Sequence, residues 1–179
     1  MRVLGLDLSS VASGWAVVDE GKVVAKGVIT FDDKMSPGAV SWYLRHQIEG
    51  IIVVYRPDEV AVEDVFLKIN YLTTKVLSRL AGVVQELWYG VYGKDVLFYY
   101  ATTARATTGI KGTAQKEEVM KAVNEKFKFR SPITDNNVAD AVVVAYCGWL
   151  KKAPEKLGAK GTFGEEKSDG IGLVKKRRR

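Results

Sequence analysis

Three acidic residues lie in or directly after apolar stretches, where a carboxylate is unfavourable unless it has a partner. Asp7 ends a short apolar stretch, Glu63 directly follows Val-Ala-Val, and Asp140 interrupts an apolar run over residues 138–145. A charge in such surroundings must be paired or bound to a metal ion. Oxygen ligands suit Mg²⁺ or Mn²⁺, and two such ions can together cleave a phosphodiester bond. The pattern therefore indicates a metal-dependent nuclease.

Each of these acids also has a simpler interpretation. Asp7 can be a turn former, Glu63 an exposed strand end, and Asp140 a partner of the helix dipole. The order of the three favours a shared site, because one acid closes the first strand, one follows a later strand, and one lies in the last helix.

The elements that must position these acids follow from the hydrophobic pattern. Alternating or short apolar runs predict strands over residues 2–8, 14–18, 23–31, 59–62 and 96–100. Helical spacing predicts helices over residues 37–55, 71–92, 114–127 and 136–150, the first of them capped by Ser36. This order predicts an α/β fold with a mixed five-stranded sheet, three antiparallel strands then two parallel, flanked by helices. If the first and fourth strands are neighbours, Asp7 and Glu63 meet at one end of the sheet.

Four stretches resemble RuvC-type Holliday junction resolvases, in the family's order and over roughly residues 1–150. They are Leu6–Ser10 with Gly14–Val17, Val62–Phe66 with Asn70, Gly112–Lys116, and Val138–Ala141. The resemblance implies the RNase H-like fold of the retroviral integrase superfamily. It also implies a homodimer that cuts two strands of a four-way DNA junction with Mg²⁺ or Mn²⁺, two ions in each active site, in DNA recombination and repair.

The resemblance assigns catalytic roles residue by residue. It implies that Asp7, Glu63 and Asp140 are metal ligands and that Lys116 lies near the cleaved phosphate. The family usually has a fourth ligand, Asp or His, three residues before the last Asp, and this chain has Asn137 there. An asparagine can coordinate through its carbonyl but brings no charge. Asp135 is an alternative donor, although a helix N-cap is its first interpretation.

The turn after the first strand is a second departure from the family. It has Asp7-Leu8-Ser9 where the family usually has Asp-Pro-Gly, which suggests a phage-like or divergent member.

Further residues are candidates for DNA contact. Arg105, Lys111 and Lys116 concentrate positive charge in one connection, which suits phosphate binding, although scattered surface charge is the alternative. Phe66 matches a family aromatic that stacks on junction bases, with an ordinary core position as the alternative. Asn70 continues the same loop and is positioned to touch the DNA backbone.

The stretch 71–92 is apolar nearly all round, which predicts a helix buried on more than one side. The resemblance implies that this helix forms the dimer interface, where Gly82 would allow close approach. The alternative is a central core helix of a monomer.

Charge divides the chain in two. Residues 1–150 contain 17 Lys and Arg against 17 Asp and Glu, whereas residues 151–179 contain 10 against 4. We therefore expect a nuclease domain over residues 1–152 and a basic, glycine-rich extension over 153–179 that tracks phosphates, with a solubilising end as the alternative.

Other features bear on where the protein works. The chain has a single cysteine, Cys147, and shows no signal peptide and no apolar run long enough for a membrane span. We expect a cytoplasmic, nucleoid-associated protein, or one in the host cytoplasm if a phage encodes it.

The predicted function is a structure-selective endodeoxyribonuclease that resolves Holliday junctions. A nuclease for a broader range of branched DNA fits the same acids. A non-catalytic junction-binding protein is a third hypothesis, motivated by Asn137. A phosphotransferase of the actin-like ATPase fold is weaker, because that architecture needs two such domains and this chain has room for one.

Overall fold

The protein is described by a computed structural model that covers residues 1–64 and 71–153. Its strands are β1 (Arg2–Asp7), β2 (Ala12–Asp19), β3 (Lys22–Thr30), β4 (Glu59–Asp64) and β5 (Leu97–Tyr100). Its helices are α1 (Pro37–Tyr55), α2 (Tyr71–Tyr92), α3 (Ala101–Thr107), α4 (Lys116–Phe127) and α5 (Asn136–Lys152). No helix in the described part of the chain has the length and apolar character that a membrane crossing needs.

The described residues form a five-stranded sheet in the order β3-β2-β1-β4-β5. β1 pairs antiparallel with β2, and β2 pairs antiparallel with β3. β4 is parallel to both β1 and β5. The predicted mixed sheet is therefore confirmed, and β1 and β4 are neighbours as the shared site requires.

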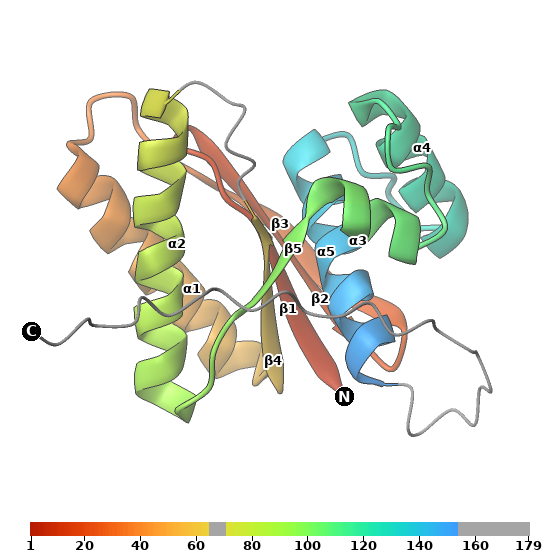
Figure 1. Cartoon of the computed structure of the whole chain (residues 1–179), viewed down its shortest axis with the longest axis horizontal. Coiled ribbons are helices and arrows are strands. Elements are labelled where there is room, and N and C mark those ends of the chain that lie inside the picture. The colour runs from red at the N-terminus through yellow and green to blue at the C-terminus, as the bar shows by residue number, and fades with distance from the viewer. Residues whose placement is uncertain (65–70, 154–179) are drawn as a thin grey trace, which may run out of the picture.

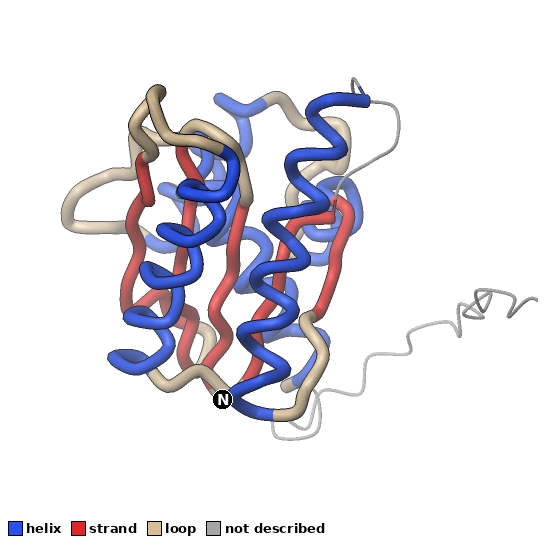
Figure 2. Tube along the Cα trace, turned by 90° about the vertical axis from the view of Figure 1, so that its left-hand side faces the viewer, coloured by secondary structure: helices blue, strands red, loops and turns tan. Residues whose placement is uncertain are grey.

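Helices cover both faces of this sheet. Figure 1 shows α1 and α2 on one side and α3, α4 and α5 on the other, and in Figure 2 the first pair lies in front of the strands. Bulky side chains fill the α1–α2 side, among them Leu4, Leu6, Leu44 and Trp88. Small and medium-sized ones, mainly Ala and Val, dominate the buried cluster on the α5 side.

Strand alternation decides which face each acid occupies. Leu4 and Leu6 of β1 pack toward α1 and α2, whereas Val3 packs toward α5. Successive side chains of a strand point to opposite faces, so Asp7 shares the α5 face with Val3.

One helix was not predicted from the sequence. α3 has seven residues, ATTARAT, without an apolar period, and Tyr100 caps it without a side-chain hydrogen bond. The usual signals of a helix are therefore missing, and α3 carries Arg105. The prediction for α1 is confirmed, since the Ser36 side chain accepts a hydrogen bond from the Ala39 backbone N–H and Pro37 is the first helical residue.

Candidate active site

Two glycines allow α5 to lie close to the sheet. A Cβ atom at Gly5 of β1 would come within 2.4 Å of the Ala141 carbonyl oxygen, and one at Gly14 of β2 would come within 2.0 Å of the Asn137 carbonyl oxygen. Both contacts are with backbone atoms of α5, so a larger residue at either position would push the helix away. Gly14 is also the β-pair partner of Asp7. The first turns of α5 are thereby held over the end of β1.

The end of β4 supplies the second acid. Leu6 of β1 pairs with Val62 of β4 in parallel register, so Asp7 and Glu63 are the next residues along two neighbouring strands. Val60 and Val62 pack on the α1–α2 side and Ala61 on the α5 side, and alternation places Glu63 with Ala61. Asp7 and Glu63 therefore lie side by side beneath α5, which carries Asp140.

The pKa values of Asp7 and Glu63 are raised by burial and by the charges of the neighbouring acids. Burial raises the pKa of Asp7 well above its usual value, and the negative charges of Glu63 and Asp140 raise it further. Burial, with the charge of Asp140, raises the pKa of Glu63 from 4.5 to about 7. These are the shifts expected where several carboxyl groups share a partly buried site without enough positive charge to compensate them.

Two basic residues oppose these shifts. The positive charges of Lys116 and Arg105 lower the pKa of both Asp7 and Glu63. Lys116 is the first residue of α4, is exposed, and follows Gln115, which forms a capping box with Glu118. The resemblance implied that Lys116 lies near the cleaved phosphate; in the structure its charge acts on Asp7 and Glu63.

Arg105 lies inside the site, not at its edge. Its Nη2 donates to Asp140 Oδ1 at 3.1 Å and its Nη1 donates to the Ala114 carbonyl oxygen at 3.0 Å. The side chains of Arg105 and Asp140 are only 15% and 8% exposed. The sequence grouped Arg105 with Lys111 and Lys116 as phosphate contacts, but its guanidinium is directed inward to the carboxylate, whereas Lys111 is exposed.

The two candidates for a fourth ligand occupy different places. The Asp135 carboxylate accepts hydrogen bonds from the backbone N–H groups of Asn137 and Val138, which confirms it as the N-cap of α5. Asn137 Nδ2 donates to the Ala12 carbonyl oxygen at 2.9 Å, so its amide ties α5 to the start of β2. Asn137 lies one helical turn before Asp140, on the same side of α5.

The remaining predicted contacts are Phe66 and Asn70, which lie outside the described residues. Among the described residues, no three His, Cys, Asp or Glu side chains are close enough together to hold a metal ion at once. The donor set nevertheless has the chemistry of a site for a hard divalent cation, because the three acids offer only oxygen and repel one another. Their side chains must close further around an ion to ligate it together.

Comparison with known proteins identifies relatives. The family model described as Crossover junction endodeoxyribonuclease RuvC matches residues 3–148. A relative with that description from Rickettsia bellii (strain RML369-C) is 30% identical over 150 residues, 82% of this chain and 95% of the relative. A Thermus thermophilus RuvC structure matches with a TM-score of 0.72 and 21% identity over 84% of this chain and 94% of that one. The same Thermus protein in complex with Holliday junction substrate gives a TM-score of 0.72 and 19% identity over the same shares.

Proposed function

This chain belongs to the RuvC family of crossover junction endodeoxyribonucleases, and we propose that it resolves four-way DNA junctions by metal-assisted hydrolysis of phosphodiester bonds. The family match includes Asp7, Glu63 and Asp140. The observation that carries the proposal is the convergence of these acids from β1, β4 and α5, with the charge of Lys116 beside them. Resolution of such junctions places the protein in DNA recombination and repair.

The three acids are the proposed ligands of Mg²⁺ or Mn²⁺, two ions in each site, with Asn137 as a neutral fourth donor. When bound, these ions would activate the attacking water and stabilise the leaving oxygen. Asp7, whose pKa is raised by the charges of both other acids, is the proposed shared ligand. Because the acids are partly buried, water solvates their carboxylates poorly when no metal is bound. A divalent cation that neutralises these negative charges would therefore stabilise the site strongly.

Lys116 is the proposed contact to the phosphate that is cut. It stands at the exposed start of α4, and its charge reaches Asp7 and Glu63. A cation there attracts the phosphate to the acids and stabilises negative charge that develops during cleavage. Lys111, exposed in the same connection, and Phe66 and Asn70 are proposed to hold the DNA around this point.

The test is incubation of a synthetic four-way junction with Mg²⁺ or Mn²⁺. We expect paired nicks at symmetric positions from the wild-type protein and a loss of at least about 1,000-fold in rate from Asp7→Asn. Junction binding by Asp7→Asn, measured by gel shift, should persist, because the carboxylate carries no DNA contact. An active Asp7→Asn protein would refute the assigned role of this acid.

The substrate range decides between junction resolution and the broader alternative. Cleavage of junctions at least tenfold faster than of forks, flaps and linear duplex supports a resolvase. Equal rates on all branched substrates would favour a nuclease with broader specificity. Tight binding without any product in either metal would favour a junction-binding protein.

We further propose that the protein is a homodimer through α2. In one chain α2 buries Leu80, Val84, Leu87 and Trp88, but Tyr89 and Val91 are 58% and 52% exposed. Within one chain the apolar surface of α2 is thus buried on one side only, which favours an interface helix over the central core helix of a monomer. A second copy would cover the other side.

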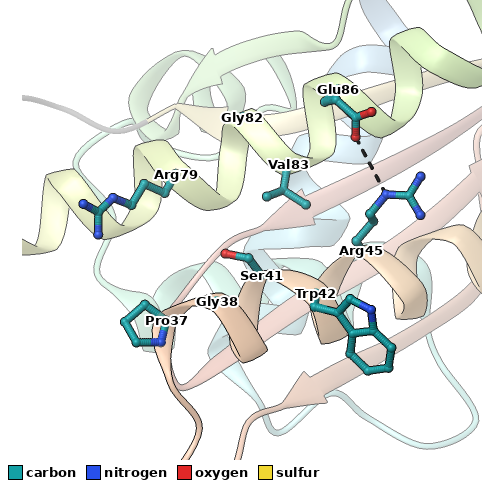
Figure 3. A pocket seen from close by; sticks show the side chains of 9 residues that line it. All are labelled: Pro37, Gly38, Ser41, Trp42, Arg45, Arg79, Gly82, Val83 and Glu86. Atoms are coloured by element: carbon teal, nitrogen blue, oxygen red, sulfur yellow. Dashed lines mark ion pairs between the residues drawn. The ribbon is translucent and has the colours of Figure 1, made fainter.

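The groove between α1 and α2 indicates how that copy could sit. It has a volume of about 590 Å³, and Trp42 and Arg45 from α1 face Arg79, Gly82, Val83 and Glu86 from α2 across it (Figure 3). Arg79 and Glu86 are equally spaced on either side of Gly82 and Val83. If two α2 helices pack antiparallel about that midpoint, Arg79 of each subunit lies against Glu86 of the partner subunit, which gives two equivalent ion pairs. Within the described residues Glu86 makes a long ion pair of 3.7 Å with Arg45, and its side chain is 71% exposed.

A charge swap tests this arrangement. Arg79→Glu or Glu86→Arg alone should raise the Kd of the dimer about tenfold or more, and the double variant should restore it. Sedimentation measures the Kd, and Lys121→Glu, at an exposed position of α4, is the control. A monomeric wild-type protein, or single variants with unchanged Kd, would refute the interface.

Two further proposals follow from the predicted extension and from the substrate. Deletion of residues 154–179 should weaken binding to DNA of any sequence and flatten its salt dependence, because the extension carries most of the net charge. An unchanged salt slope would refute this role.

We place the protein in the cytoplasm at the nucleoid, or in the host cytoplasm if a phage encodes it, because its DNA substrate is there.

A further inference from the structure

One guanidinium connects two parts of the site that come from different elements. Arg105 of α3 donates through Nη2 to Asp140 of α5 and through Nη1 to the Ala114 carbonyl oxygen. Ala114 is two residues before Lys116, in the segment that leads into α4. The Arg105 clamp, meaning Arg105 with these two acceptors, therefore spans the acid on α5 and the approach to the lysine on α4.

The geometry of the clamp depends on arginine. Its planar guanidinium presents fixed, forked donors, whereas a lysine offers one compact ammonium. The Arg105 Nε is buried and has no hydrogen-bond partner in the described part of the chain, so the hydrogen bonds of the guanidinium there are those of its two Nη atoms. Breaking a pair that is this well buried would leave an uncompensated charge beside Asp7 and Glu63.

The segment between α3 and α4 has other anchors, but none of the following reaches the acids. Lys126 Nζ donates to the Thr108 carbonyl oxygen at 3.1 Å, and the Ile110 backbone N–H donates to the Arg105 carbonyl oxygen at 2.9 Å. These contacts fix the start of the segment. The contact from Arg105 Nη1 fixes its end, at Ala114, relative to Asp140.

We infer that Arg105 is a positioning residue of the cleavage site, which orients the Asp140 carboxylate and holds the start of α4 so that Lys116 stays over the acids. The inference rests on the proposed function. It differs from the phosphate contact that the sequence suggested for Arg105, because a side chain paired inward holds protein groups in place and does not bind DNA.

Cleavage and binding separate the two roles. With Arg105→Met the single-turnover rate on a four-way junction should fall about 100-fold, since a misplacement of about 1 Å has that effect, while the Kd for the junction changes less than about twofold. Arg105→Lys keeps the charge but cannot make both contacts, so its rate should fall about tenfold. Lys121→Met removes a cation from the exposed side of α4 and is the matched control, with wild-type rate and affinity expected.

Hydrogen exchange provides a readout without metal or substrate. In chelator-treated Arg105→Lys protein, the backbone N–H groups of residues 112–116 should exchange about tenfold faster than in wild type, because the clamp no longer holds Ala114. The N–H groups of α1, on the other face of the sheet, should exchange as in wild type. Arg105→Lys retains the charge next to Asp140, so it serves if Arg105→Met does not fold.

The outcomes are distinct. A weaker Kd with a salt slope reduced by about 1 in Arg105→Met would show a phosphate contact and overturn the inference. Full cleavage by Arg105→Lys would overturn it too, because charge alone would then suffice. If the wild-type protein cuts no branched DNA, the proposed function fails, and hydrogen exchange then tests the Arg105 clamp by itself. Faster exchange at residues 112–116 in Arg105→Lys supports the clamp, and unchanged exchange refutes it.

Discussion

The two faces of the sheet are closed by helices in opposite ways. On the α1–α2 face, bulky side chains such as Leu44, Ile48 and Trp88 fill the space between helix and strand. On the α5 face, Gly5 and Gly14 let the helix backbone come so near that a Cβ at either position would collide with it. Bulky packing stabilises the fold, whereas close backbone approach brings polar groups of different elements together.

This difference explains where charge is buried. Asp140 is buried on the α5 face, where it pairs with Arg105 and lies above the strand ends that carry Asp7 and Glu63. On the α1–α2 face, the groove between the two helices is lined by the charged residues Arg45, Arg79 and Glu86. The α5 face is therefore the proposed site of cleavage, and the α1–α2 face is the proposed site of contact with a second copy.

Among substitutions that test the packing of the two faces, the largest effect is expected from Gly14→Ala, which fills the closest approach on the α5 face. The added Cβ would meet the Asn137 carbonyl oxygen at 2.0 Å, and neither backbone can yield cheaply. α5 must move off β2, so stability should fall by about 2–3 kcal/mol and cleavage by about 100-fold. Thermal unfolding and a single-turnover assay measure the two effects. Wild-type values for both would show that close approach of α5 is not needed.

A change of comparable size but opposite sign, a gain in stability, is expected from Glu63→Gln, which removes a half-buried charge from the same face. The pKa of Glu63 in the folded protein, about 7, lies above its usual 4.5, so the folded state binds more protons between those pH values. Stability of the metal-free protein should therefore fall as pH rises from about 4.5 to about 7. Glu63→Gln should make the stability of the metal-free protein depend less on pH in this range. At pH 8 it should stabilise the metal-free protein by roughly 3 kcal/mol at most.

Unfolding in chelator at several pH values checks this prediction. The advantage of Glu63→Gln should vanish near pH 4.5 and shrink on addition of Mn²⁺, because a bound cation stabilises the charged acid. If the variant is less stable than wild type at pH 8 in chelator, neighbouring groups already stabilise the charged Glu63 carboxylate, and the prediction is wrong.

The sequence predicted the strands and the long helices, because these carry strong local signals. It also singled out the three acids, since Glu63 follows Val-Ala-Val within β4 and Asp140 is the one acid in an apolar helix. Their role as metal ligands stays a prediction. The inward role of Arg105 could not be predicted, because it depends on α3, which has no apolar period, and on a contact between residues 35 positions apart. The tie between Asn137 and Ala12 is likewise a long-range contact, across 125 positions. Gly14 was a usable signal, since an unexplained glycine in a strand indicates close approach of another backbone.

Asn137→Asp should have two smaller effects of opposite sign. An aspartate cannot donate to the Ala12 carbonyl oxygen as Asn137 Nδ2 does, so the metal-free protein should lose about 1 kcal/mol. The added charge should strengthen metal binding. We expect wild type to cleave faster with Mn²⁺ than with Mg²⁺, because Asn137 brings no charge to the ligand set, and Asn137→Asp to narrow that gap. Titration calorimetry and rates in both metals test this, and equal wild-type rates unchanged by the substitution would count against it.

The smallest effect is expected on the other face, from Gly82→Ala. A Cβ at Gly82 meets nothing within 4 Å, so the substitution fits one chain and should stabilise α2 by about 0.5–1 kcal/mol through helix propensity. If a second copy packs closely at Gly82, the same methyl group should raise the Kd of the dimer. Gly50→Ala, at an equally open position of α1, is the matched control and should bring the gain in stability without the change in Kd. A dimer unaffected by Gly82→Ala would place the close contact elsewhere on α2, and the α1–α2 face would then bind its partner through bulky side chains, in the way it packs internally.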